Sequence, residues 1–392
     1  MDKLQTGLAT GIAVLDKNKP KHPDPALDGK NTLLPLGSTP TAATSSRIKL
    51  PTAENVPDGG PAVEVPHICI GTWSWGDRPV WQWDDETQLP LRREALRTLL
   101  LDHDHDHDQG LNLNFIDTAQ MYGGGRAEEV VGELLSELFA AGEIQRKDVI
   151  VQTKWDVSPT SPNNILHLGA EAPVRALKES LKRLRLEYVD VYLVHGHVHA
   201  QSIAAVAEGM ARCVSLGLTR AVGVSNYSPD GCRKMQEVLS SHGVPLAVNQ
   251  CEYGVLRRRP ELDGDIAAYR NEMGVVFQAY APLAQGRLTG KYDSKDNRPP
   301  AARRFANYDM EAIEPAVAVL REFAERRGKS GPAPVALNYV LCKGALPVVG
   351  VKDAKQARQA AEALGWRLSN EDVVMIDRCS LEGKKTSFWQ QG

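Results

Sequence analysis

Eight short apolar segments alternate along the chain with longer amphipathic stretches, and this alternation constrains the fold more than any other feature of the sequence. Several of the segments are continuous apolar runs, such as VDVYLVH at 189–195, rather than runs in which apolar and polar residues alternate. Parallel strands that are covered on both faces have this composition. The expected strands are 67–72, 113–117, 150–154, 189–195, 220–225, 246–250, 275–280 and 346–350.

The stretches between these segments carry the repeat of an amphipathic helix. The segment 127–142 places five branched apolar side chains on one stripe and ends with Gly142, a usual residue at a helix C-terminus. The segments 175–186 and 311–328 follow the same pattern. A helix after nearly every strand predicts an α/β fold, a (β/α)8 TIM barrel. A doubly wound sheet is the alternative, but no GxGxxG phosphate-binding turn follows any expected strand.

The first part of the chain differs in composition from the rest. Residues 1–62 are rich in Pro, Gly, Thr, Asp and Lys and have almost no aromatic residues. Such a segment buries too little apolar surface to offset the entropy lost on ordering, so we expect a disordered N-terminal extension. Residues 63–392 are then the barrel domain, since a barrel of this type usually needs about 250 residues or somewhat more.

Charge and cysteine usage exclude several classes of partner. The net charge is −3 at pH 7, which indicates neither nucleic acid nor an anionic membrane as a partner. The six cysteines are scattered and form no CxxC pair, which fits a reducing compartment better than a disulfide framework. No apolar run approaches the roughly 18 residues that span a bilayer. The predicted location is the cytoplasm and the predicted partner a small molecule; the oligomeric state is not indicated.

Four chemically compatible residues lie at the carboxyl ends of successive expected strands, where a barrel of this type carries its active site. They are Asp117, Tyr122 in the loop after it, Lys154 and His195. Carbonyl reduction needs a proton for the developing alkoxide, and a phenol is a reluctant donor or acceptor near neutral pH. A neighbouring ammonium lowers the pKa of a phenol, and a carboxylate would hold that ammonium in place. His195 would orient the carbonyl.

The order of these motifs resembles the aldo-keto reductase superfamily. The resemblance is carried by NFIDTAQMYGGG, VIVQTKW, YVDVYLVH, AVGVSNY, NQCEY, APLAQGRLTGKY and PVVGVKDAKQ, which follow one another between about residues 66 and 366. It implies a (β/α)8 barrel that binds NADP(H) without a Rossmann motif and reduces an aldehyde or ketone to an alcohol. It also implies that Asp117, Tyr122, Lys154 and His195 are the catalytic residues, with Tyr122 as proton donor.

The same resemblance assigns roles in binding. Asp117, Ser225, Asn226 and Gln250 would lie at the nicotinamide end of the cofactor, and Tyr280 would stack on its ring. The pyrophosphate side and the adenosine phosphate would be bound by Leu283, Gln285, Lys291, Gly350, Lys352 and Gln356. Trp73, Trp155 and His195 would line the carbonyl substrate, although packing in the core is the alternative for the two tryptophans.

Two segments depart from the superfamily pattern. Gln359-Ala360 stands where related sequences commonly carry Glu-Asn for adenine, and an alanine cannot hydrogen-bond a base. The residues 196–199, Gly-His-Val-His, replace a more common Trp-Pro and leave room for a larger or aromatic substrate. The residues 196–199 and the last nine residues, KKTSFWQQG, are similar to those of a fungal branch of the superfamily that is associated with secondary metabolism.

Two other functions remain open on the residues. His195, His197 and His199 are spaced as zinc ligands on one face of an extended segment, so a metal-dependent barrel hydrolase is one alternative. The other strand ends offer no further ligands, and we expect no metal. The run DHDHDHD at 102–108 is expected to form an acidic loop on the opposite face of the barrel. A cofactor-binding regulatory subunit, like the potassium-channel β subunits that resemble this superfamily, is the second alternative.

Overall fold

The computed structural model describes residues 47–53, 62–102, 111–158, 169–303 and 309–382. Eight strands form a closed barrel in the order β10-β3-β4-β5-β6-β7-β8-β9, and each strand pairs in parallel with its neighbours. The predicted (β/α)8 barrel is therefore confirmed, and each strand lies within two residues of its predicted bounds. The barrel strands are β3 (Cys69–Gly71), β4 (Phe115–Asp117), β5 (Ile150–Trp155), β6 (Val189–Val194), β7 (Thr219–Ser225), β8 (Leu246–Glu252), β9 (Val276–Tyr280) and β10 (Leu346–Gly350).

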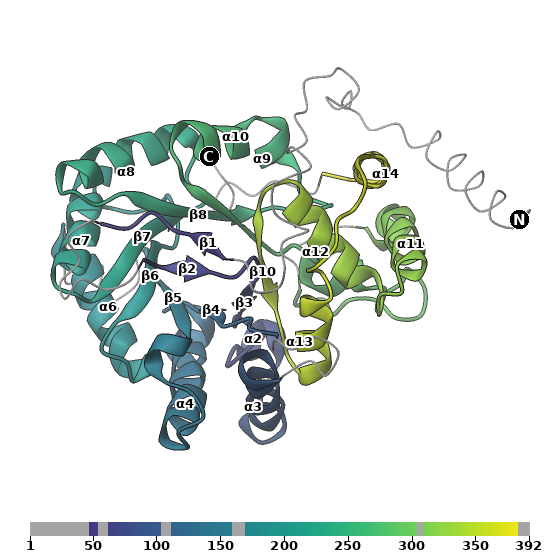
Figure 1. The fold of residues 1–392 in the computed structure, drawn as a ribbon, viewed down its shortest axis with the longest axis horizontal. Helices are drawn as coiled ribbons and strands as arrows, with labels where there is room; N and C mark the ends of the chain where they lie inside the picture. The colour runs from purple at the N-terminus through teal and green to yellow at the C-terminus, as the bar shows by residue number, and fades with distance from the viewer. Residues whose placement is uncertain (1–46, 54–61, 103–110, 159–168, 304–308, 383–392) are drawn as a thin grey trace, which may run out of the picture.

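Helices surround the barrel on its outside (Figure 1). Most barrel strands are followed by one long helix, whereas β8 is followed only by short helical turns. The long helices are α3 (Asp85–Leu101), α4 (Arg126–Ala140), α6 (Glu171–Leu184), α7 (Ile203–Ser215), α8 (Pro229–Ser241), α11 (Met310–Arg326) and α12 (Pro332–Cys342). The shorter elements are α2 (Arg78–Trp81), η3 (Tyr122–Gly125), η4 (Arg146–Asp148), α9 (Arg259–Leu262), α10 (Asp265–Ala267), η5 (Ala268–Glu272), η6 (Ala284–Thr289), α13 (Ala354–Ala361) and α14 (Asn370–Arg378).

Capping residues determine where several helices begin. The Asp84 side chain accepts a hydrogen bond from the Thr87 amide at 2.9 Å, so α3 begins at residue 85 and runs on past Pro90. Ser202 and Ser228 cap α7 and α8 in the same way. The helix predicted at 175–186 is observed as α6 and begins at Glu171, because a proline in the first turn costs no hydrogen bond.

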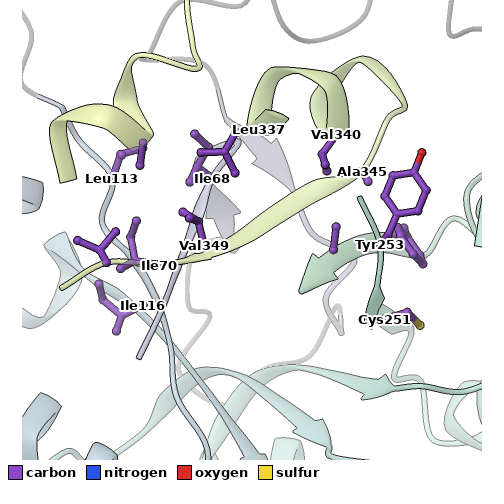
Figure 2. Close-up of a cluster of buried hydrophobic side chains, with 14 of the residues drawn as sticks. Ile68, Ile70, Leu113, Ile116, Cys251, Tyr253, Leu337, Val340, Ala345 and Val349 are labelled. Carbon is purple, nitrogen blue, oxygen red and sulfur yellow. The ribbon is translucent and has the colours of Figure 1, made fainter. Parts of the chain in front are cut away.

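The apolar residues form one large core between the strands and the helices and a smaller one inside the barrel. In the large core, Ile68, Ile70 and Val349 from the barrel pack near Leu337 of α12 (Figure 2). All six residues of β6 are buried, as expected for a parallel strand that packs on both faces. The two cores hold the strands in register, and this register determines which residues lie at the strand ends.

A short antiparallel hairpin precedes the barrel. Its strands are β1 (Ile48–Lys49) and β2 (Glu64–Val65), and Leu50, Val63 and Val65 are at most 3% exposed. These three side chains pack with the interior residues of the barrel. Within the extension predicted at 1–62, the stretch 47–53 is thus ordered, because its apolar residues cover the barrel interior. Residues 1–46 and 54–61 lie outside the described part of the chain.

In the part of the chain that the structure describes, no helix combines the length and the apolar character needed to cross a membrane.

Candidate active site

The four predicted catalytic residues come together at one end of the barrel. Asp117 ends β4, Lys154 lies next to the end of β5, and His195 directly follows β6. Lys154 Nζ donates hydrogen bonds to Asp117 Oδ2 at 2.7 Å, to the Thr118 carbonyl at 3.0 Å and to Tyr122 Oη at 3.1 Å. All three ammonium hydrogens therefore have acceptors, and the Lys154 side chain is completely buried.

The Gly-rich loop after β4 gives Tyr122 its position. Gly123, Gly124 and Gly125 all adopt left-handed backbone conformations, with φ of 58°, 65° and 100°. A Cβ atom on Gly123 would lie 2.5 Å from the Gly76 carbonyl oxygen, and one on Gly125 would lie 2.9 Å from the Arg183 side chain. Only glycine fits both the conformation and the space, so the three glycines allow Tyr122 to turn back over Lys154.

Burial and charge compete in the electrostatics of this pair. Burial raises the pKa of Tyr122 above its ordinary value, and the opposing effect of the Lys154 ammonium does not reverse the shift. The Lys154 ammonium does lower the pKa of Tyr122, as expected from the sequence, but its effect is smaller than that of burial. Burial alone would lower the pKa of Lys154, but the charges of Asp117 and Tyr122 and their hydrogen bonds raise it overall. The free site therefore holds a protonated phenol beside an ammonium–carboxylate pair.

His195 completes the site as a neutral group. Its ring centroid lies 5.4 Å from that of Tyr122, with the two planes at 77°. Burial, and secondarily the charge of Lys154, lower the pKa of His195 well below its ordinary value. A neutral imidazole beside a protonated phenol can share the oxygen of a carbonyl without introducing a second cation.

Two buried glutamines that the sequence analysis missed contact Asp117 or its neighbours. Gln152 Nε2 donates to Asp117 Oδ1 at 2.6 Å and to Gln278 Oε1 at 2.9 Å. Gln152 precedes Lys154 by two residues, and Gln278 precedes Tyr280 by two. Because alternate residues of a strand share a face, a polar residue two positions before a site residue was the available signal.

The residues predicted at the nicotinamide end are also brought to this end of the barrel. Ser225 ends β7, Asn226 follows it, and Gln250 lies near the end of β8; all three are at most 3% exposed. Ser225 Oγ donates to the Gln250 carbonyl at 2.8 Å, and Tyr280 Oη donates to Asn226 Oδ1 at 3.3 Å. Gln250 Nε2 also lies 3.2 Å from Asp117 Oδ1, which connects these residues to the catalytic group.

Unusual backbone conformations cluster in the same loops. Among the described non-glycine residues with positive φ are Asn226 at 62°, Ala281 at 53°, Ala284 at 48° and Gln285 at 55°. Each such residue costs on the order of 1–3 kcal/mol, and strain of this kind concentrates where loops are shaped for a ligand. Both amide atoms of Gln285 are buried without a hydrogen-bond partner among the described residues, so the loop after β9 holds an unpaired polar group.

A group of cations lies beyond β10. Lys352 Nζ is 4.0 Å and Arg303 Cζ is 4.5 Å from the ring centroid of Trp81. Burial, followed by the charges of Arg303, Arg92 and Lys291, lowers the pKa of Lys352 to about 7, against a smaller opposing effect of Asp353. Cations that lower one another's pKa in this way favour the binding of an anion. Arg92, Arg303 and Trp81 were not identified from the sequence.

The other predicted cofactor residues surround this group. Gln356 Oε1 accepts from the Lys352 amide at 3.2 Å, and its Nε2 donates to Asp353 Oδ2 at 2.9 Å. Leu283 precedes η6, and Lys291 and Gly350 are exposed. Ala360 is 2% exposed within the large core, which explains an alanine at this position of α13. Gln359 is half-buried.

The two tryptophans predicted as pocket walls have different environments. Trp73 is half-buried, its ring centroid lies 6.2 Å from that of Tyr122, and its indole N–H donates to Asp77 at 3.0 Å. Trp155 is 0% exposed and belongs to the large core. Trp73 therefore lies beside the Tyr122 phenol, whereas Trp155 packs within the large core. Trp81 contacts Trp73 edge to face at 5.6 Å and extends the aromatic wall.

The histidines after β6 do not form a cluster. Both ring nitrogens of His199 are engaged by other groups, Nδ1 with the Gln201 carbonyl at 2.6 Å and Nε2 with Tyr227 Oη at 2.7 Å. Among the described residues, no group of three or more His, Cys, Asp or Glu side chains could hold a metal ion. Of the predicted acidic loop at 102–108, only Asp102 is described, and it pairs with Arg358 at 2.8 Å.

Known proteins of one family are similar to this chain over the whole barrel. Residues 67–381 match the model of the aldo/keto reductase family. A chloroplastic pyridoxal reductase of Arabidopsis thaliana is 29% identical over 332 residues, which cover 83% of this chain and 86% of the relative. An L-glyceraldehyde 3-phosphate reductase of Escherichia coli O157:H7 is 34% identical over 298 residues, covering 71% and 83%. A solved glycerol dehydrogenase of Gluconobacter oxydans is similar with a TM-score of 0.64 and 25% identity, covering 84% of this chain and 94% of that one.

Proposed function

We propose that this chain, which belongs to the aldo/keto reductase family of oxidoreductases acting on carbonyl groups, reduces an aldehyde or a ketone to an alcohol with NADP(H). One observation carries the proposal. The Tyr122 phenol accepts a hydrogen bond of 3.1 Å from a buried ammonium, which is itself paired with Asp117 at 2.7 Å. A phenol in this environment can release a proton to a developing alkoxide, since the neighbouring ammonium stabilises the phenolate that is left.

The other residues would prepare this proton transfer. Neutral His195 would donate a hydrogen bond to the carbonyl oxygen near Tyr122. Trp73 would pack against the substrate next to the phenol. Lys154 would stabilise the charge that appears on Tyr122, while Asp117 keeps the ammonium in place. The raised pKa of Tyr122 supports the direction of reduction, because the free enzyme then presents the phenol in its protonated form.

The residues present fit a dinucleotide with an additional phosphate. The unpaired amide of Gln285 supplies a buried polar group, and the cations around Lys352 supply positive charge that Asp353 offsets only in part. Ser225, Asn226 and Gln250 would bind the nicotinamide carboxamide, Tyr280 would stack on the ring, and Lys352 would bind the adenosine phosphate. When bound, NADPH would supply the hydride for the carbonyl carbon. Leu283, Lys291, Gly350 and Gln356 would line the remainder of the cofactor.

The decisive variant is Tyr122→Phe. We expect its kcat for carbonyl reduction to fall about 10²- to 10⁴-fold, the range that a positioned proton donor contributes. The dissociation constant of NADPH should stay within about twofold of the unmodified chain. The measurement follows NADPH and NADH oxidation with a panel of aromatic and aliphatic aldehydes. Tyr188→Phe is the matched control, because that hydroxyl bonds Arg220 at 3.1 Å, away from Lys154.

The outcomes distinguish the alternatives. Full activity of Tyr122→Phe would remove the proton-donor role from this residue. Tight NADPH binding by the unmodified chain, without turnover of any carbonyl in the panel, would favour the cofactor-binding regulatory subunit. Turnover that needs zinc but no nicotinamide cofactor would favour a metal-dependent hydrolase.

Substrate and location are extensions of the same proposal. The aromatic wall of Trp73 and Trp81 favours flat or aromatic carbonyl compounds, and a place in secondary metabolism is consistent with such substrates. Val198, three residues after His195, is an exposed apolar side chain at 44%. A reducing compartment such as the cytoplasm is supported by the six cysteines, which are scattered along the chain and all buried.

A further inference from the structure

Three buried glutamines form one network with the Asp117 carboxylate on the inside of the barrel; two of them bond the carboxylate, and the third bonds those two. They are Gln152 of β5, Gln250 of β8 and Gln278 of β9, and each is at most 2% exposed. Asp117 Oδ1 accepts from Gln152 Nε2 at 2.6 Å and from Gln250 Nε2 at 3.2 Å. Asp117 Oδ2 accepts from Lys154 at 2.7 Å. The carboxylate therefore has donors on both oxygens.

Gln278 closes this arrangement from the far side. Its Oε1 accepts from Gln152 Nε2 at 2.9 Å and from Gln250 Nε2 at 2.8 Å. Its Nε2 donates back to Gln152 Oε1 at 3.1 Å. Since a side-chain amide has only two N–H donors, both donors of Gln152 and both donors of Gln250 are used. Each of these two amides thus bridges the oxygens of Asp117 and Gln278.

The count of donors determines how Gln250 is oriented. An amide can be turned by 180° without changing its shape, so its orientation follows from its hydrogen bonds. Turning Gln250 would place its carbonyl oxygen against Asp117 Oδ1 and Gln278 Oε1, two acceptors that offer it no hydrogen. In the observed orientation Oε1 of Gln250 accepts no hydrogen bond from the described residues, and it is the atom left for a ligand. A ligand group that bonds it must be a donor.

We propose that Gln152 and Gln278, which nothing in the sequence motifs singled out, are positioning residues for the reaction. Gln152 holds the Asp117 carboxylate in the orientation that keeps Lys154 on Tyr122. Gln278 holds Gln250 so that its carbonyl oxygen faces the N–H donors of the nicotinamide carboxamide. This inference rests on the proposed function, since it assigns the two glutamines to the same site.

The physical argument for Gln152 is geometric. Lys154 Nζ has its three hydrogens on Asp117, Thr118 and Tyr122, so a rotation of the carboxylate draws the ammonium away from the phenol. Gln152 opposes that rotation with the shortest bond to Oδ1, at 2.6 Å, and it adds no titratable group. Hydrogen bonds to a charged group are also the stronger ones in proteins.

The test is a double-mutant cycle with Gln152→Met, Gln278→Met and the two together. Gln278→Met leaves two buried amides without their common acceptor, so it should lower Tm more than the double variant does. The double variant removes the bonds between the two glutamines altogether, so it leaves fewer buried groups unpaired than Gln278→Met does, although Gln250 and Asp117 each still lose one partner. Leu193→Met, another fully buried residue of the barrel interior, is the control for the change of side chain alone.

Function should respond differently from stability. In the double variant we expect kcat to fall at least about tenfold although its Tm lies above that of Gln278→Met and only moderately below that of Leu193→Met. Gln278→Met should weaken NADP+ binding about tenfold, measured by quenching of intrinsic tryptophan fluorescence, because Gln250 loses its orientation. Gln278→Glu keeps both acceptor bonds but adds a carboxylate beside Asp117. It should change the pH profile of kcat relative to the unmodified chain, since it adds a second negative charge near the pair of Asp117 and Lys154.

Wild-type kcat, NADP+ affinity and pH profile in the folded double variant would overturn the inference while leaving the proposed function intact. If the unmodified chain binds NADP+ but reduces no carbonyl, the proposed function fails and the NADP+ affinities still decide the role of Gln278. If it binds no NADP+ at all, both fail together.

Discussion

At the scale of single residues, burial is the largest influence on the ionisable groups of the site. It raises the pKa of Tyr122, lowers that of His195 and lowers that of Lys352 to about 7. Neighbouring charges oppose the effect of burial on the pKa. They reverse it for Lys154, whose pKa is raised overall, and only reduce it for Tyr122. The site is thus built from groups whose protonation states suit reduction near neutral pH.

The Lys352 ammonium provides a prediction about pH. Above pH 7 the free chain has lost most of this charge, whereas a bound phosphate favours the protonated form. Binding must then take up a proton, so the affinity for NADP+ should fall as pH rises. We expect a decrease of about tenfold or more between pH 6.5 and 8.5, measured by fluorescence titration.

Two variants check this assignment. Lys352→Met should bind NADP+ about ten- to a hundredfold more weakly at pH 6.5 and show a much flatter dependence on pH. Lys355→Met removes an exposed lysine of α13 and should keep the slope of the unmodified chain. An unchanged slope in Lys352→Met would show that another group takes up the proton.

At the scale of elements, the hairpin of β1 and β2 is the part of the fold that the barrel pattern did not suggest. Leu50 is 1% exposed and packs on the barrel interior, although it belongs to a segment of polar, turn-forming composition. The open end of a barrel leaves apolar interior residues uncovered, and a short apolar hairpin is enough to cover them.

The hairpin should therefore contribute to stability. Leu50→Ala is expected to lower the free energy of unfolding by about 2–5 kcal/mol, the range for truncating a buried leucine. Lys49→Ala changes the exposed neighbour and should stay within about 0.5 kcal/mol of the unmodified chain. Both values come from denaturant unfolding. Equal effects of the two substitutions would mean that the hairpin is not packed in solution as described.

At the scale of the whole molecule, a buried charge network joins parts of the chain that are far apart in sequence. Lys343 after α12 bonds Glu261 of α9 at 2.6 Å and Asp377 of α14 at 2.8 Å. Arg258 bonds the same two carboxylates at 3.0 and 3.3 Å. Two cations and two carboxylates thus hold the C-terminal helix against the barrel.

Breaking this network should be costly and sensitive to acid. Lys343→Met is expected to destabilise the fold by about 3–5 kcal/mol, because it leaves buried carboxylates with one cation fewer. Arg93→Met removes a half-exposed ion pair with Glu137 and should cost at most about 1 kcal/mol. Similar unfolding free energies for the two variants would contradict the structural role of the network.

The dependence of stability on acid follows from the lowered pKa of Glu261. Burial alone would raise its pKa, but Lys343 and Arg258 lower it to about 2. A lowered pKa contributes stability that is present above the ordinary value of 4.5 and is lost as pH falls from 4.5 through 2. In Lys343→Met the folded-state pKa of Glu261 lies closer to 4.5, so this acid-dependent loss should be smaller and end at a higher pH, as followed by unfolding curves between pH 7 and 2.

The barrel, and the meeting of the four proposed catalytic residues at one end of it, could be predicted because each depends on local patterns. Continuous apolar runs indicate buried parallel strands, and the last residues of such strands meet at one end of a closed barrel. Asp117, Lys154 and His195 could be placed together from this rule alone. Gln152 and Gln278 also lie two residues before a predicted site residue. The bond of Gln152 to Asp117 and the bonds between the two glutamines can be recognised only once the strands around the barrel are in register.

The sequence by itself determined the alternation of strands and helices, the glycines behind Tyr122 and the identities of the groups at the strand ends, because these depend on neighbours a few residues away. The tertiary structure alone decided that Trp81 lies between Trp73 and the cations Arg303 and Lys352. It also decided that burial outweighs Lys154 at Tyr122, and that two glutamines bond Asp117 while a third glutamine bonds both of them. Burial and pairing between distant strands are properties of the closed barrel, and no local pattern carries them.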